Sequence, residues 1–247
     1  MVQGVNTQIG AKNKWENYAL RVDTNTSSKL ATFELTVKKT LELLGNRRDG
    51  RLLDIGCGFG EIDVLLAIKT NFLITACDIS DTCLKKTKEA VQKSGKNSRI
   101  KVEHGDVYNL FYPDNFFDIA TSFGYASAAT YKGAQGGIWR ILKPNGLLIC
   151  DFINALSIYK FFKVPRKWKD IKKESVKEYN FVTTQGIREY FQRYNFEFLN
   201  QKFFNSYPPF NFLSKEQLLF FERTFGKFFN RFLGRVRLVC FRKIEKI

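Results

Sequence analysis

Apolar residues along the middle of the chain follow two different periods. Between residues 51 and 153, short apolar runs alternate with stretches in which apolar residues recur every three or four positions. The first pattern predicts buried strands and the second predicts helices. The predicted strands are RLLDIG (51–56), FLITACDIS (72–80), RIKVEHGD (99–106), FFDIATS (116–122) and LLICDFI (147–153), and the predicted helices between them cover 62–70, 81–95 and 133–146. This alternation is typical of a parallel, doubly wound α/β sheet.

The flanking segments predict a helical cap before this core and a mixed region after it. Helical patterns cover 15–22 and 28–45. After the core come a lysine-rich helical stretch broken by Pro165, a helix over 183–194, a strand over 196–205, a phenylalanine-rich helix and a last strand over 236–244. The two late strands would add an antiparallel pair to the sheet edge. We therefore divide one domain into a cap (1–47), a core (48–153) and a lid region (154–247) that includes the last two strands.

The composition fits a globular protein, but the charge is uneven. Hydrophobic residues make up 44% and charged residues 26% of 247 residues, and no apolar run is long enough to span a bilayer. Five cysteines without a C-x-x-C pair predict reduced thiols in a cytoplasmic protein and no metal site. The net charge is +16, and residues 151–247 hold 20 of the 40 basic but only 9 of the 24 acidic residues. Because 18 of the 25 phenylalanines also follow residue 150, we expect an anionic or amphiphilic partner on that side.

The segment LLDIGCGFGE (52–61) places three glycines directly after the first core strand. A glycine loop at the carboxyl end of a parallel strand lets the backbone approach a ligand that any Cβ would push away. A dinucleotide and S-adenosylmethionine are the two ligand types that fit. Glycines at Gly56, Gly58 and Gly60 depart from the G-x-G-x-x-G spacing of a dinucleotide loop. Asp54 at the strand end disfavours a pyrophosphate and suits a ligand that carries an ammonium and a sulfonium group.

With this loop, the sequence resembles the class I S-adenosylmethionine-dependent methyltransferases, in particular their small-molecule, type 11-like branch. Asp78 in ITACDIS, Asp106 in VEHGDV, the segment FFDIATSFGYAS (116–127) and the segment RILKPNGLLIC (140–150) match four further family motifs in order. The resemblance covers about residues 48–153. It implies a mostly parallel, seven-stranded Rossmann-like sheet with helical lid insertions and S-adenosyl-L-methionine as the cofactor. The cofactor-binding residues that it implies are Asp54, Gly56, Cys57, Gly58, Gly60, Asp78, Ile79, Asp106, Val107 and Ser122, with Asp78 at the ribose and Asp106 at the adenine.

Methyl transfer from a sulfonium is an in-line displacement in which the enzyme mainly holds the attacking atom against the methyl carbon. A general base is needed only where the attacking group is protonated at neutral pH. The catalytic residue stays unknown, with Tyr125 and His104 as candidates and an aromatic pocket wall and a surface histidine as their alternative interpretations. Tyr18 is interpreted equally as a contact of the cofactor or as packing.

Two segments of the lid region are candidates for the acceptor side. Residues 160–179 combine eight basic and three acidic residues with aromatic residues, and residues 216–235 carry phenylalanines at helical spacing. Both fit a solvated or packed helix, and both fit peripheral contact with a membrane surface. Nucleic acid is a further candidate partner of the basic half. The oligomeric state stays unknown.

We therefore predict an enzyme that transfers a methyl group from S-adenosylmethionine to oxygen or nitrogen of a small or lipid-like acceptor. The first alternative is a tRNA or rRNA methyltransferase that uses the basic C-terminal half. The second is a non-catalytic, cofactor-binding partner subunit. The expected location is the cytoplasm, with the membrane surface as an alternative.

Overall fold

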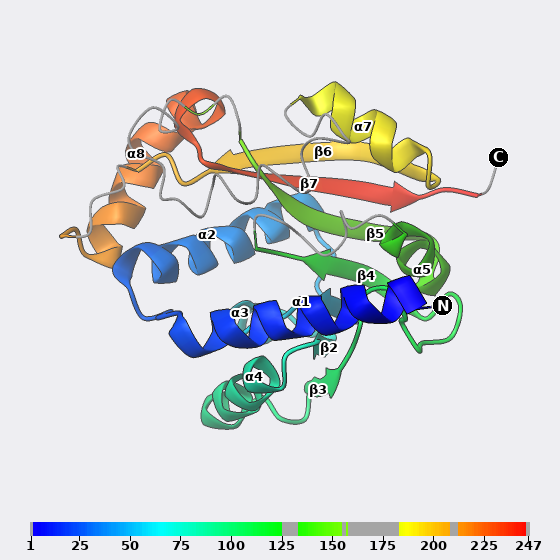
Figure 1. The fold of residues 1–247 in the computed structure, drawn as a ribbon. Coiled ribbons are helices and arrows are strands. Elements are labelled where there is room, and N and C mark those ends of the chain that lie inside the picture. Colours follow the sequence, from blue (N-terminus) through cyan, green and yellow to red (C-terminus); the bar gives the residue numbers. More distant parts are fainter. Residues whose placement is uncertain (1, 125–132, 155–156, 158–182, 208–211, 246–247) are drawn as a thin grey trace.

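A computed structural model describes residues 2–124, 133–154, 157, 183–207 and 212–245. Seven strands form one sheet in the order β3-β2-β1-β4-β5-β7-β6 (Figure 1). The strands are β1 (Arg51–Ile55), β2 (Leu73–Asp78), β3 (Ile100–His104), β4 (Phe117–Ser122), β5 (Leu142–Ile153), β6 (Phe196–Phe204) and β7 (Val236–Lys243). The first five pair in parallel, and β7 pairs antiparallel with both β5 and β6. The predicted α/β class and the antiparallel C-terminal pair are confirmed.

Helices cover both faces of this sheet (Figure 1). The described helices are α1 (Val2–Arg21), α2 (Ser27–Leu44), α3 (Glu61–Lys69), α4 (Asp81–Ser94), α5 (Ala134–Ile141), α7 (Thr184–Gln192) and α8 (Lys215–Leu233). One apolar cluster joins α5 and α7 to one sheet face, and a second joins α2, α3 and α8 to the other. Consecutive strand residues alternate between the two clusters, as Leu52 and Leu53 do, because side chains of a strand point to opposite faces in turn.

The predicted helix over 133–146 is wrong in its second half. Helix α5 ends at Ile141, and the chain enters β5 at Leu142 without an intervening loop. The pairing of β5 with β4 shifts register between Phe117 and Ile119. Asn145 takes a left-handed conformation (φ 59°), and a Cβ at Gly146 would lie 2.8 Å from the carbonyl oxygen of Lys143. The Pro-Asn-Gly turn is therefore a local irregularity inside the strand.

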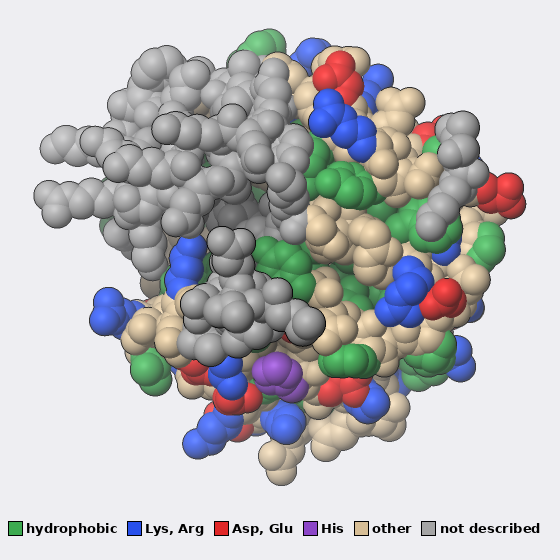
Figure 2. Space-filling model, turned by 45° about the vertical axis from the view of Figure 1, so that its right-hand side comes forward, with side chains coloured by type: hydrophobic (Ala, Val, Ile, Leu, Met, Phe, Trp, Pro, Cys, Tyr) green, Lys and Arg blue, Asp and Glu red, His purple; other side chains and the backbone are tan. Residues whose placement is uncertain are grey.

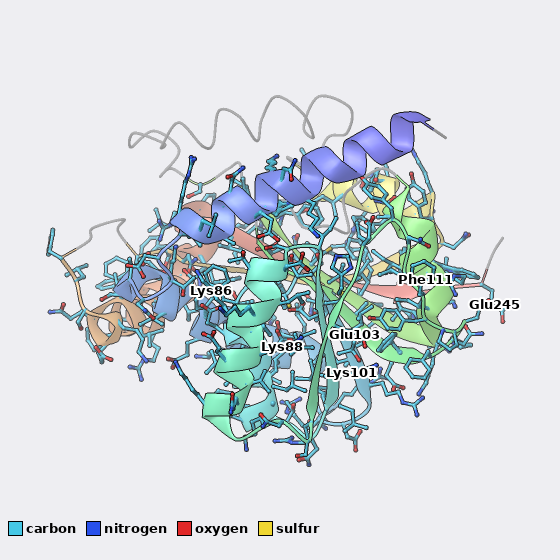
Figure 3. The ribbon with its side chains drawn as sticks, turned by 60° about the horizontal axis from the view of Figure 1, so that its bottom comes forward. Lys86, Lys88, Lys101, Glu103, Phe111 and Glu245 are labelled. Carbon is cyan, nitrogen blue, oxygen red and sulfur yellow. The ribbon has the colours of Figure 1, made fainter. Side chains whose placement is uncertain are left out.

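Helix α1 is longer than the predicted 15–22, and it packs on α4 at the carboxyl end of the sheet (Figure 3). The side chain of Glu16 accepts hydrogen bonds from the first backbone amides of α4, including that of Asp81. Lys12 forms an ion pair with Asp81 (2.7 Å), and Lys86 Nζ donates to the carbonyl oxygen of Ala19 (2.9 Å). Since a carboxylate at a helix N-terminus satisfies otherwise unpaired amides, Glu16 fixes α1 over this edge.

The predicted lysine-rich stretch over 160–179 lies outside the described residues. Among the residues that are described, we find no helix with the length and apolarity that crossing a bilayer requires.

Candidate functional site

The three glycines of the loop after β1 all need a left-handed backbone, but they differ in what surrounds them. Their φ angles are 78°, 61° and 78° at Gly56, Gly58 and Gly60. A Cβ at Gly60 would lie 2.6 Å from Thr87 Cγ2 in α4, whereas a Cβ at Gly56 or Gly58 would meet nothing within 4 Å. Gly60 therefore serves the packing of α3 and α4. Gly56 and Gly58 border open space at the sheet edge, which suits close approach of a ligand.

Most backbone amides of this loop already donate hydrogen bonds to acceptors within the protein. The amides of Gly56 and Cys57 both donate to the carbonyl oxygen of Cys77 (2.8 and 3.0 Å), and the amide of Gly60 donates to that of Cys57. The amide of Gly58 donates to Asp78 Oδ2 (3.0 Å). A pyrophosphate binds to free amides at a helix N-terminus. A loop whose amides already have acceptors disfavours such a ligand.

Asp54, at the end of β1, is buried (2% exposed) and accepts a hydrogen bond from Thr121 Oγ1 in β4 (2.7 Å). Burial raises the pKa of Asp54 to about 7, the hydrogen bond from Thr121 opposes this, and the nearby carboxylates of Asp78 and Asp151 add to the rise. Asp151 is buried in β5 and accepts from the amide of Gly124 (3.0 Å). Three strand ends therefore bring carboxylates to one place.

Asp78, at the end of β2, is held by backbone amides on both of its oxygens. Oδ2 accepts from Gly58 and Oδ1 accepts from Ser80 (2.9 Å). Burial raises the pKa of Asp78, while these amides lower it. A carboxylate has about four acceptor sites, so each oxygen keeps capacity for a further donor such as a hydroxyl group.

The acid Asp63, in the first turn of α3, was not expected at the site. It is fully buried, and neither carboxylate oxygen has a hydrogen-bond partner among the described residues. Burial raises its pKa well above the usual value, and the charge of Asp54 raises it further. In the sequence, Asp63 could have been recognised as a site candidate because it is an acid inside the apolar stretch IDVLLA. Asp151, an acid inside the strand LLICDFI, could have been recognised in the same way.

The remaining predicted cofactor-binding residues differ in how deeply their side chains are buried. Asp106 is half-buried in the loop after β3, where Oδ1 accepts from the amide of Tyr108 (3.0 Å). Ile79 is half-buried beside Asp78, and Val107 is in the core. Ser122 Oγ donates to the carbonyl oxygen of Ile55 (2.9 Å), so its hydroxyl supports the pairing of β4 with β1.

Of the two candidate catalytic residues, the structure describes only His104, whose backbone pairs with that of Asp78 where β3 and β2 end. His104, at the end of β3, is exposed. Tyr125 lies outside the described residues. Tyr18 of α1 is partly exposed, and burial together with nearby Cys83 and Glu61 raises its pKa.

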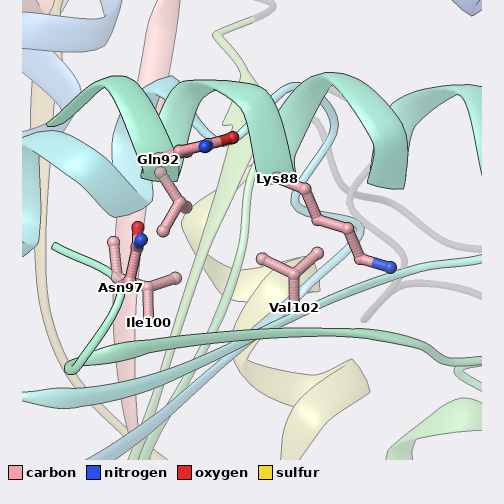
Figure 4. Close-up of a pocket in the computed structure, with 6 residues that line it drawn as sticks. Lys88, Gln92, Asn97, Ile100 and Val102 are labelled. Atoms are coloured by element: carbon pink, nitrogen blue, oxygen red, sulfur yellow. The ribbon is translucent and has the colours of Figure 1, made fainter. Parts of the chain in front are cut away.

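Two hollows of the described surface lie away from these acids. One, of about 310 Å³, lies between α4 and β3 and is lined by Lys88, Val91, Gln92, Asn97, Ile100 and Val102 (Figure 4). The other, of about 470 Å³, includes Arg51, Arg99 and Phe116 at the opposite edge of the sheet. Neither contains a loop glycine or a converging carboxylate, so the glycine loop remains the candidate site.

Comparison with known proteins finds similarity to methyltransferases. Residues 53–150 match the family described as "Methyltransferase domain". Demethylmenaquinone methyltransferase of Staphylococcus aureus is 32% identical over 116 residues, which are 46% of this chain and 47% of that protein. Residues 53–150 therefore form a domain of the class I S-adenosylmethionine-dependent methyltransferase type. The chain spans about half the length of the curated relatives that it matches.

Solved structures of low identity share the fold of this methyltransferase. Phosphoethanolamine N-methyltransferase 2 of Haemonchus contortus, in complex with S-adenosyl-L-methionine, superposes with a TM-score of 0.58 at 16% identity, over 94% of this chain and 60% of that one. The [4+2]-cyclase SpnF gives a TM-score of 0.60 at 18% identity, over 92% and 86% of the two chains. Because a cyclase shares it, the fold does not define the reaction.

The residues of the methyltransferase fit S-adenosylmethionine, the cofactor of its family. Gly56 and Gly58 leave open the space that side chains would fill. Asp54 and Asp78 border that space with carboxylates, which suit the positive charge of this cofactor and its ribose hydroxyl groups.

Proposed function

We propose that this chain transfers a methyl group from S-adenosylmethionine to oxygen or nitrogen of a small or lipid-like acceptor. The observation that carries the proposal is the pair Gly56 and Gly58. Their left-handed backbone faces open space next to two buried acids. In this proposal the glycines border the methionine part of the cofactor, Asp78 accepts from the ribose hydroxyls, and Asp106 lies at the adenine.

The bound cofactor supplies an electrophilic methyl group on a sulfonium. The chain supplies orientation, which by itself accounts for a large part of the rate of such a displacement. Asp54 is held by Thr121, and Asp78 by two amides. Both carboxylates are therefore fixed before the ligand arrives. Helix α1 packs on α4 at the same edge of the sheet.

The acceptor class is supported by the C-terminal helix and by one relative. Helix α8 presents phenylalanines at its surface, including Phe228 at 78% exposure. The Staphylococcus aureus relative is named for demethylmenaquinone, a lipid-like quinone. A lipid-like acceptor fits both observations.

The RNA alternative needs a continuous basic surface. On the face in Figure 2, Lys and Arg side chains are scattered among acidic and hydrophobic ones. The described side chains of that face form no continuous phosphate-binding stripe, so they give the RNA alternative no support.

A labelling experiment tests the proposal. Purified protein and S-adenosylmethionine labelled in the methyl group are incubated separately with lipid, small-metabolite, RNA and protein fractions. We expect label in the lipid or small-metabolite fraction. Label in RNA would favour the alternative enzyme, and cofactor binding without label in any fraction would favour a non-catalytic subunit.

Two variants with the same charge change control this experiment. Asp78→Asn should abolish labelling, because it removes the charge of the carboxylate that faces the cofactor space. Asp114→Asn removes an exposed carboxylate of the loop before β4, which pairs with Arg140 of α5. This variant should transfer label as the wild type does. Equal activity of Asp78→Asn and the wild type would refute the site.

A further inference from the structure

Helix α8 exposes a stripe of phenylalanines to solvent. Phe225, Phe228, Phe229 and Phe232 are 43%, 78%, 48% and 60% exposed. They are spaced by three, one and three residues, so they share one face of a helix with 3.6 residues per turn. Most large apolar side chains of the chain are buried, and a contiguous exposed group of four marks an interaction surface. We call these four residues the phenylalanine face.

Helix α8 is firmly anchored to the rest of the protein, so the exposure of the phenylalanine face does not reflect a loosely packed helix. Ser214 and Gln217 form a reciprocal cap at its start. Leu218 is fully buried, and the buried carboxylate of Glu222 accepts from the amide and hydroxyl of Ser206 (2.8 Å each). At its end, Asn154 Nδ2 donates to the carbonyl oxygen of Gly234 (2.8 Å). The sequence pattern predicted one apolar stripe, but only its leucine side is in the core.

Positive charge flanks the phenylalanine face. Arg231 is exposed three residues after Phe228 and so lies next to it on the helix surface, whereas Arg223 is exposed on the far side of the helix. The only acid of α8 after the first turn is Glu222, which is 5% exposed. A helix with aromatic residues on one side and basic residues beside them has the chemistry of an element that lies in an anionic membrane surface. A second copy of this chain is a poorer occupant, because the whole protein carries +16 and like charges would face each other.

The topology places α8 at the same edge of the sheet as the glycine loop. Helix α8 connects the end of β6 to the start of β7. Val236, the first residue of β7, pairs with Ile153 at the end of β5. The end of β5 is parallel to the end of β4, where Ser122 pairs with Cys150. A surface that holds α8 would therefore also hold the cofactor edge nearby.

We propose that the phenylalanine face, with Arg231 beside it, docks on the surface of an anionic lipid bilayer. The phenylalanines insert at the boundary between headgroups and acyl chains, and the guanidinium group of Arg231 contacts lipid phosphates. This inference does not depend on the identity of the acceptor, because it concerns binding to the bilayer and not methyl transfer.

Vesicle sedimentation tests the docking surface. The full chain is mixed with phosphatidylcholine vesicles, or with vesicles that contain one quarter phosphatidylglycerol, and the bound fraction is measured. We expect binding to the anionic vesicles that weakens as salt rises. Phe228→Ser should lower the partition coefficient about tenfold. Arg231→Gln should lower it about fivefold, and only on anionic vesicles, whereas Arg223→Gln, on the far side of the helix, should lower it less.

Phe111→Ser is the matched control, because Phe111 is 86% exposed on the loop after β3 and lies off α8. It should bind vesicles as the wild type does, and thermal melting should show that all variants are folded. Wild-type protein that stays unbound with anionic vesicles would overturn the proposal. Equal losses in Phe228→Ser and Phe111→Ser would do so too. A dimer that Phe228→Ser converts to a monomer, without vesicle binding by the wild type, would assign the face to a second copy instead.

Discussion

The different surroundings of Gly56 and Gly60 predict that one substitution, glycine to alanine, has two separable effects. Both residues have a φ of 78°, so alanine at either position costs about 1–2 kcal/mol of backbone strain. The smaller conformational entropy of alanine in the unfolded chain offsets about 0.4–1 kcal/mol of this cost. Gly56→Ala should therefore lower the free energy of unfolding by only about 1 kcal/mol.

Gly60→Ala adds a steric conflict. The new methyl group would lie 2.6 Å from Thr87 Cγ2 and 3.3 Å from the Thr87 backbone Cα, and overpacking of this kind costs about 1–3 kcal/mol. We expect Gly60→Ala to be less stable than Gly56→Ala by about 2 kcal/mol, which corresponds to about 4–8 °C in Tm for a chain of this size.

Cofactor binding should show the reverse order. The methyl group of Gly56→Ala enters the open space beside the acids, where it should weaken S-adenosylmethionine binding at least tenfold. Gly60→Ala, assayed below its Tm, should bind more nearly as the wild type does. Urea denaturation and titration calorimetry measure the two effects. If Gly56→Ala bound S-adenosylmethionine normally, the space beside Gly56 would not be the cofactor site.

Three carboxylates give further predictions. The pKa of Asp54 is raised to about 7, so its protonated form stabilises the fold fully below about pH 4. This stability is lost as pH rises through 7. Urea titrations at pH 5 and pH 8 should show that the free energy of unfolding falls by about 2–3 kcal/mol more in the wild type than in Asp54→Asn. Asp63→Ala should leave the stability at pH 7 unchanged or raise it by about 1 kcal/mol, because the buried acid lacks a partner among the described residues; a large loss would reveal one. Asp78→Asn should weaken S-adenosylmethionine binding about 10- to 100-fold and lower Tm moderately, because its single oxygen can accept from only one of the amides of Gly58 and Ser80. Asp78→Ala releases both amides and should lower Tm further; identical melting curves of the two variants would contradict this.

The sequence predicted the strands and the glycine loop well because local pattern and tertiary role agree there. Leu52 and Leu53 are buried on opposite faces, and a strand between two helical layers must be apolar throughout. The end of α5 was missed for the opposite reason. Residues 133–146 have a helical period, but the pairing of Leu142 with Phe117 overrides it.

From the sequence, a candidate site residue could be predicted only where its own position in the pattern indicated it. Asp54 and Asp78 lie at the ends of predicted strands, so their place at the edge of the sheet could be predicted. The hydrogen bond of Thr121 to Asp54 joins residues 67 positions apart, and Glu16 reaches α4 across 65 positions. Spacing within one segment has no information on such contacts. The pattern of α8 likewise gave the apolar residues but not which of them are in the core.

The carboxylates at the sheet edge are an acidic site within a strongly basic protein, and this contrast has a consequence for cofactor binding. The charges of Asp78 and Asp151 raise the pKa of Asp54, and the charge of Asp54 raises that of Asp63. A positively charged ligand favours the ionised form of these groups, so its affinity should increase as pH rises through about 7. Calorimetry between pH 6 and pH 8 should show stronger S-adenosylmethionine binding at the higher pH, and Asp54→Asn should reduce that difference. Binding to anionic vesicles through Arg231 should change little over the same range, since arginine keeps its charge, but should respond to salt. An affinity for S-adenosylmethionine that falls with pH would show that the acids do not face its charge.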